Sequence, residues 1–229
     1  TLRTDEITNV DSDASRFIRD QEGTRTTSAI GHTLFYDRRD NRIDPTEGYF
    51  ASLSNDLAGL GGDARYIRTR VSSGYYYPVK APDWVLSVAG EVGHIQGLGK
   101  DVAIQDRFFI GGDTLRGFET GGIGPRDIET GDALGGNTFA VGTVSLQFPL
   151  GLPQELGVAG RVFTDFGTLF NIDQSGSEIV DKSSLRASIG TGVSWKSPFG
   201  PIRVDFAVPV VKEMFDEKEL FRVSFGTRF

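Results

Sequence analysis

The fold is decided by the last stretch of the chain, Leu220-Phe221-Arg222-Val223-Ser224-Phe225-Gly226-Thr227-Arg228-Phe229. From Phe221 onward, apolar residues and one threonine occupy every second position, and arginine, serine and glycine occupy the positions between them. Successive side chains of a β-strand point to opposite faces of its sheet. This stretch therefore predicts a strand with one apolar face and one polar face.

The same period-two alternation recurs along almost the whole sequence, whereas helical periodicity is hard to find. In 185–196, for example, Ile189 and Val193 alternate with serine, glycine and charged residues. The pattern predicts an all-β fold of about nine strands, at 29–39, 48–58, 65–77, 84–95, 138–148, 157–168, 185–196, 201–210 and 220–229.

The lengths of the expected strands favour a membrane protein. Each is near the 9–11 residues with which a tilted strand crosses a bilayer, whereas strands of soluble sandwiches are usually nearer 5–6 residues. Compact links also alternate with long polar ones, as they do in outer-membrane barrels with short periplasmic turns and long external loops. We therefore predict an antiparallel transmembrane β-barrel.

The links divide into two sets. Turn-forming residues fill the compact links expected on the periplasmic side, at 44–48, 80–83, 150–153 and 197–201. The longer links are 59–64, 96–137, 169–184 and 211–219. Aromatic residues collect near the compact links, where membrane barrels carry an interfacial girdle, at Tyr75, Tyr76, Tyr77, Trp84, Phe148, Trp195, Phe199 and Phe229.

Composition limits the remaining possibilities. A chain of 229 residues with 38% hydrophobic residues and 30 glycines suits one structural unit, 1–229. It has no cysteine, and its net charge of −7 disfavours nucleic acid as a partner. Its longest apolar stretch, 206–211, is far too short for a membrane helix. The amino terminus lacks the profile of a signal peptide, which predicts a mature, excised or truncated chain.

Nine strands is an unusual number, because bacterial single-chain barrels have an even count. Either residues 1–12 contain a tenth strand, or part of the barrel is missing. The polar segment 11–27 is expected to be an external loop, joined to a strand cut near Thr1. An unclosed sheet would leave two edges exposed to lipid, so we expect stability only in a longer chain, a complex or an oligomer.

The longest link, 96–137, carries the tetrad Leu115-Arg116-Gly117-Phe118 after Phe108-Phe109-Ile110-Gly111-Gly112. It resembles the sixth external loop of the BamA family of outer-membrane assembly insertases. Three further segments are similar to that family in the same order. They are Phe163-Thr164-Asp165-Phe166-Gly167, the turn Ser197-Pro198-Phe199-Gly200-Pro201, and a terminal strand that resembles the β-signal of outer-membrane barrels.

The resemblance implies a barrel of about sixteen strands preceded by POTRA domains, of which this chain holds the last nine or ten strands. It also implies insertion of other barrels through a seam between the first and last strands. In this sequence the seam would involve Phe221, Val223, Phe225 and Phe229. The expected partners are unfolded outer-membrane proteins, outer-membrane lipid and accessory assembly lipoproteins, and no cofactor is needed.

Arg116 is the residue of the loop with the clearest chemistry. If the loop folds into the lumen, its guanidinium needs a carboxylate, because an unpaired buried charge is expensive. Asp165 faces the lumen by alternation, and in the resembling family the equivalent aspartate meets the loop arginine. Some relatives carry a second carboxylate where this chain has Gln147, so we expect no second salt bridge. Gly111, Gly112 and Gly117 suit a sharp turn or a close approach to the wall.

Signals for an enzyme or a metal site are missing. His32 and His94 have no metal-ligand spacing, and no nucleophile motif or phosphate-binding loop is present. The charged run from Asp37 to Asp40 is interpreted as a network beside a turn. Three alternatives to the insertase remain: a translocation or two-partner secretion pore of the same superfamily, a passive diffusion porin, and an outer-membrane hydrolase. A hydrolase would require a nucleophile and a base close together, and the sequence offers no recognisable pair.

Overall fold

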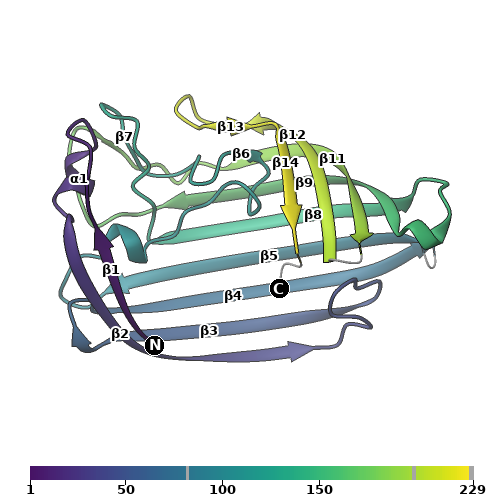
Figure 1. Cartoon of the computed structure of the whole chain (residues 1–229), viewed down its shortest axis with the longest axis horizontal. Helices are drawn as coiled ribbons and strands as arrows, with labels where there is room; N and C mark the ends of the chain where they lie inside the picture. Colours follow the sequence, from purple (N-terminus) through teal and green to yellow (C-terminus); the bar gives the residue numbers. More distant parts are fainter. Residues whose placement is uncertain (81–82, 198–199, 227–229) are drawn as a thin grey trace.

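A computed structural model describes residues 1–80, 83–197 and 200–226 (Figure 1). Ten strands form one sheet, and all neighbouring strands in it are antiparallel. In sheet order they are β1 (Leu2–Ile7), β2 (Gly23–Asp37), β3 (Gly48–Gly62), β4 (Tyr66–Lys80), β5 (Trp84–Gly97), β8 (Thr138–Pro149), β9 (Val158–Phe170), β11 (Arg186–Ser197), β12 (Gly200–Val211) and β14 (Phe221–Phe225). The predicted all-β, antiparallel architecture is confirmed.

Short elements lie in the links between these strands. They are helix α1 (Arg16–Arg19), the 3-10 helices η1 (Ile104–Asp106) and η2 (Gln154–Leu156), and strands β6 (Gly117–Phe118), β7 (Arg126–Asp127), β10 (Ile179–Val180) and β13 (Lys218–Glu219). Strand β6 pairs with β13 and β7 pairs with β10, so segments of three different links join each other. Within the described ranges, no helix has the length and apolarity needed to cross a membrane.

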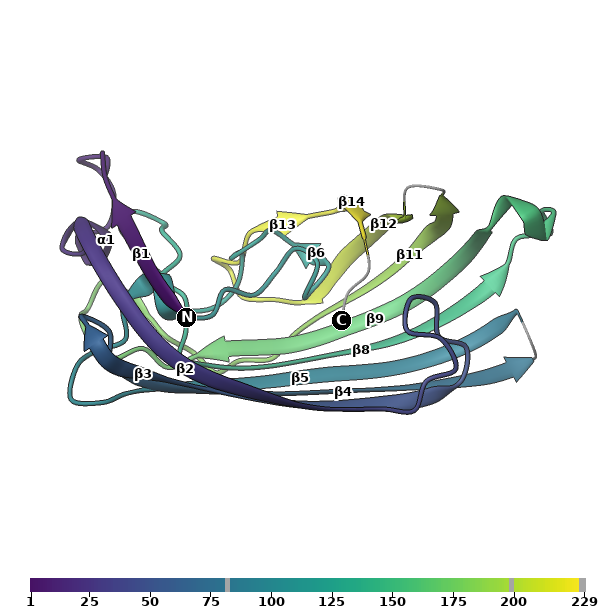
Figure 2. The same cartoon turned by 60° about the horizontal axis from the view of Figure 1, so that its bottom comes forward.

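The sheet is curved into a trough, and the long link lies on its concave side (Figure 2). Apolar side chains on the opposite, convex face are exposed, among them Val162, Phe166, Ile189, Val193, Phe206 and Val208. Their neighbours in sequence point to the concave face, where Asp165, Ser188 and Asp205 are buried. A sheet with apolar side chains outside and buried polar side chains inside has the distribution required by lipid outside and a polar lumen inside.

Two of the predicted links are wrong in extent. The link expected at 59–64 is mostly strand, because β3 continues to Gly62, whose φ of +82° a glycine adopts without strain. The loop expected at 11–27 contains α1, and β2 already begins at Gly23. A register shift between Thr27 and Ala29 lets β2 include the end of the segment that was expected to be a loop.

Residues 1–12 do contain a tenth strand, since β1 pairs with β2 over six positions. The turn-side charge network is confirmed, because Arg39 Nε donates to Asp37 Oδ1 at 2.9 Å and the Thr46 amide donates to Asp40 Oδ1 at 2.9 Å. The predicted turn residues 81–82 and 198–199, including Phe199, and the terminal residue Phe229 lie outside the described residues.

Candidate functional site: the long loop on the concave wall

The link between β5 and β8 is anchored to the sheet by its apolar side chains. Leu115 and Phe118, the two apolar members of the tetrad, are fully buried. They belong to one core cluster with Phe108 and Ile110 of the loop and with wall residues such as Phe139. Burying a large apolar side chain contributes about 1.5–3 kcal/mol, so this packing holds the loop against the wall.

Arg116 lies between Leu115 and Phe118 in the sequence, and its side chain is paired with Asp165 of β9. Its Nε donates to Asp165 Oδ2 at 2.7 Å and its Nη2 donates to Oδ1 at 2.7 Å, which is a bidentate ion pair. The Arg116 amide and the Thr143 hydroxyl also donate to this carboxylate, at 3.1 and 2.6 Å. Asp165 is only 2% exposed as a side chain, so these donors replace the water it has lost.

A second carboxylate approaches Arg116, contrary to the expectation drawn from Gln147. Arg116 Nη1 lies 3.7 Å from Asp205 Oδ2 on β12, and Asp205 also accepts a bond from Arg161 Nε at 2.8 Å. The two arginines and two aspartates therefore form one network. The expectation was wrong because it considered only the strand that follows the loop, whereas the second carboxylate comes from a strand near the end of the chain.

Gly192 of β11 makes this network possible. Strand β11 separates β9 from β12, and Gly192 is in register with Arg161 on one side and Asp205 on the other. A Cβ at this position would collide with Asp205 Oδ1. Because Gly192 has no side chain, the Arg161–Asp205 pair can span the intervening strand.

The backbone around the tetrad has the conformations that the glycines predicted. Gly111, Gly112 and Gly117 have φ values of +131°, +58° and +92°. At Gly117 a Cβ would lie 3.1 Å from Ser188 Cβ, so the loop touches the wall there. The Arg116 guanidinium lies 3.3 Å from the centroid of the Phe163 ring, which adds a cation–π contact.

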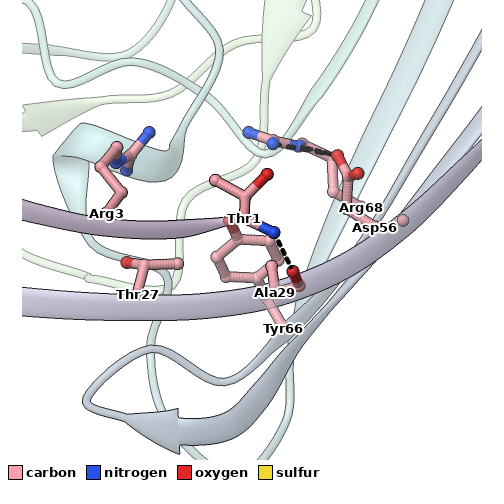
Figure 3. A pocket seen from close by; sticks show the side chains of 8 residues that line it. Thr1, Arg3, Thr27, Ala29, Asp56, Tyr66 and Arg68 are labelled. Carbon is pink, nitrogen blue, oxygen red and sulfur yellow. Dashed lines mark hydrogen bonds and ion pairs between the residues drawn. The ribbon is translucent and has the colours of Figure 1, made fainter.

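The start of the loop is held by β1 and β2 through Asp106, which the sequence analysis did not single out. Its buried carboxylate lies 3.0 Å from Arg3 Nη2 and 3.3 Å from Arg25 Nη2. A cavity of about 70 Å³ lies beside this cluster and is lined by Arg3, Thr27, Tyr66 and Arg68, among others (Figure 3). On the same wall, Arg68 forms an ion pair with Asp56 at 3.0 Å (Figure 3).

The segment containing α1 docks on the far end of the loop. The Ser15 hydroxyl donates to Asp127 Oδ2 at 2.7 Å, and the Ser15 amide donates to Asp132 Oδ2 at 2.7 Å. Burial by itself raises the pKa of Asp127. The hydrogen bonds from Ser15 and from the amides of Glu129 and Thr130 outweigh burial, so the pKa of Asp127 lies below its usual value.

We expect the segment 8–22 to loosen at acid pH. Because folding lowers the pKa of Asp127, the ionised carboxylate adds stability that is complete above about pH 4, the usual aspartate pKa. This contribution decreases as the pH falls and is lost below the pKa of the folded state. Hydrogen exchange of 8–22, corrected for the intrinsic rate at each pH, should therefore accelerate below about pH 4. An Asp127→Asn variant should exchange fast at every pH, and a wild-type rate unchanged on acidification would contradict the prediction.

The same loop reaches the segment that leads into the last strand. Arg126 forms an ion pair with Glu217, and β6 pairs with β13 at Gly117 and Glu219. The seam residues predicted from the sequence lie on the other face. Phe221, Val223 and Phe225 point outward and are 49%, 41% and 76% exposed. The structure thus brings Arg116 and Asp165 together on the concave face, whereas these seam residues lie on the opposite face of a strand that β11 and β12 separate from β9.

Sequence reasoning missed Arg161 and Asp205 as partners of the site. Both alternate with apolar neighbours and so carried the signal of a lumen-facing charge. The sequence contains no sign that Arg161 meets Asp205, because that depends on the register of three strands.

Comparisons with known protein families, sequences and structures find proteins that are similar to this chain. All of the chain, residues 1–229, matches the model of the Omp85 superfamily domain. The outer membrane protein assembly factor BamA of Neorickettsia risticii is 39% identical over 227 residues, covering 99% of this chain and 30% of that protein. BamA of Nitratidesulfovibrio vulgaris is 32% identical, covering 96% of this chain and 28% of that protein. The chain therefore spans about 30% of the length of these relatives.

A more distant relative is the sorting assembly machinery 50 kDa subunit of Saccharomyces cerevisiae, 26% identical over 90% of this chain and 43% of that protein. Among solved structures, the crystal structure of BamA from Haemophilus ducreyi lacking POTRA domains 1–3 is similar with a TM-score of 0.78 and 26% identity. That match covers 87% of this chain and 42% of that chain. A family model matched over every residue, and a relative that is 39% identical over 99% of this chain, show that this chain belongs to the Omp85 superfamily.

Proposed function

We propose that the protein containing this chain folds and inserts β-barrel proteins into the bacterial outer membrane. The observation that carries this proposal is the last strand, β14, which lies at the edge of the described sheet with an apolar outer face. We propose that in the full-length barrel this edge closes against the first strand, and that it presents unpaired amides and carbonyls to an incoming strand when that seam opens. Relatives that match nearly the whole chain are named outer membrane protein assembly factors, which supports the same conclusion.

In this proposal the work is mechanical and not enzymatic, so it needs no cofactor. The long loop, fixed to the wall by Arg116, keeps the concave side of the sheet in one conformation while the edge strand pairs with a client. The clients are unfolded outer-membrane proteins, and membrane lipid and accessory assembly lipoproteins are further partners. The chain supplies ten strands of a larger barrel, and we propose that the remaining strands and the POTRA domains belong to the full-length protein.

A depletion-and-rescue assay tests the proposal. Cells depleted of the endogenous protein receive the full-length protein with Arg116→Glu, and assembly of other outer-membrane barrels is scored. We expect a severe loss of assembly, because a third carboxylate would then face those of Asp165 and Asp205. The charge swap Arg116→Glu with Asp165→Arg should restore part of the assembly.

The matched control is Arg65→Glu, which reverses the charge of an exposed arginine in the link between β3 and β4. It should assemble barrels normally. Normal assembly by the Arg116→Glu protein at wild-type abundance would show that the Arg116 pair is not needed for insertion. Normal assembly in depleted cells that receive no rescuing protein would refute the insertase role and favour a pore of the same superfamily.

A further inference from the structure

The polar side chains of the last strand are bonded to the long loop and not to the neighbouring strand. Arg222 Nη2 donates to Thr120 Oγ1 at 3.1 Å, and the Ser224 hydroxyl donates to Asp113 Oδ1 at 2.5 Å. Arg222 Nη1 also lies 3.8 Å from Asp113. Arg222 Nε also donates to Glu219 Oε2 of β13 at 3.1 Å. Both side chains of β14 that point to the concave face therefore reach the loop.

The backbone leading into the last strand is bound to the same loop. The Glu119 amide donates to Glu217 O at 3.1 Å, and the Glu217 amide donates to Gly122 O at 2.9 Å. Close approach is required here, since a Cβ at Gly122 would lie 2.7 Å from Glu217 O. Together with the β6–β13 pairing, these bonds fix where the chain enters β14.

Within the described residues, the pairing of this strand in the sheet is short. Strand β12 pairs with β14 at five positions, from Ile202↔Phe225 to Phe206↔Phe221, but with β11 at eleven positions. In the described sheet β14 has a neighbour on one side only. A strand with few ladder bonds to its neighbour depends on other contacts for its position.

We propose that Asp113 and Thr120 are positioning residues that latch the last strand to the loop, and that release of this latch exposes the strand edge to an incoming β-strand. The proposal rests on the proposed function, because it assigns the edge of β14 to client pairing. The latch lies on the concave face, whereas a client would pair along the edge, so the two contacts do not compete for the same atoms. The loop thus controls the mobility of the edge without covering it.

The test uses the full-length protein in lipid bilayers with the loop-side double variant Asp113→Ala and Thr120→Val. These changes remove both acceptors and leave the last strand unaltered. The matched control is Asp101→Ala with Thr130→Val, the same substitutions in the same loop, at residues bonded to Gln174 and Asp132. Should the double variant fail to fold, Ser224→Ala removes the donor of the Asp113 bond from the strand side.

Two measurements are made on each protein. Hydrogen exchange of 221–225 should accelerate about tenfold or more in the latch variant, with no change at 158–170, because local opening becomes more frequent. A photoreactive peptide with the sequence of residues 220–225 should be captured about threefold or more better by the latch variant, because it adds to the freed edge. The control double variant should match the wild-type protein in both.

Unchanged exchange at 221–225 overturns the latch. Faster exchange without greater peptide capture overturns its role in exposing the edge. Failure of the proposed function is distinct: normal barrel assembly in depleted cells without any rescuing protein, with peptide capture still raised in the latch variant, leaves the latch standing and removes only the insertase role.

Discussion

Replacing Asp165 with alanine is expected to destabilise the folded protein by about 3–5 kcal/mol and to release the long loop from the wall. Arg116 would lose both hydrogen bonds of the bidentate pair and the bond from its own amide. Its remaining carboxylate, Asp205, is 3.7 Å away and already bonded by Arg161. Most of this loss of stability comes from leaving the guanidinium in the protein without a close partner. Less of it comes from losing the attraction within the pair.

Unfolding by urea in detergent micelles, followed by tryptophan fluorescence, measures this cost. The matched control is Asp56→Ala, which breaks the half-exposed pair with Arg68 and should cost about 1 kcal/mol or less. Protease cleavage within 98–137 should become rapid in Asp165→Ala and stay slow in the control. Equal unfolding midpoints for the two variants would show that the Arg116 pair does not anchor the loop.

The second large effect is expected at Arg186, which forms an ion pair with Asp216 that is 0% exposed on both sides. Arg186 Nε lies 3.1 Å from Asp216 Oδ2, and this oxygen also accepts the Glu213 amide at 2.7 Å. The pair joins β11 to the link that precedes the last strand. Arg186→Met should cost about 3–5 kcal/mol, because it leaves the Asp216 carboxylate buried with a single amide donor.

A double variant separates the cost of leaving Asp216 buried without its partner from the contribution of packing around Arg186. Arg186→Met with Asp216→Leu replaces both charges by apolar side chains of similar volume, which is often nearly neutral. We therefore expect the double variant to recover most of the unfolding free energy lost in Arg186→Met. A double variant as unstable as the single one would mean that the stability comes from packing around Arg186 and not from its charge.

The sequence by itself determined the class of fold, because the evidence for it is local. Alternation within each strand, as at Phe221, Val223 and Phe225, reports which side chains share a face without reference to any other part of the chain. The same alternation placed Asp165 on the lumen side. The tetrad around Arg116 was equally visible, since its glycines and its lone charge between apolar residues lie next to each other in sequence.

The links were predicted less well for a physical reason. Strand β2 begins earlier and strand β3 ends later than predicted, and both include polar or glycine-rich sequence. A strand continues wherever its neighbour offers ladder bonds. Gly62 and the register shift after Thr27 are set by that pairing. The prediction from local sequence therefore made these two strands too short.

Only the tertiary structure decided which further charges join the Arg116–Asp165 pair. Asp205 approaches Arg116 and Arg161 because two registers place Gly192 between β9 and β12, and the sequence of no single strand contains that information. The bonds of Asp113 and Thr120 to the last strand join residues 111 and 102 positions apart. Such contacts form after the strands have paired, so their partners follow from strand register and loop path, whereas the faces of each strand follow from its own residues.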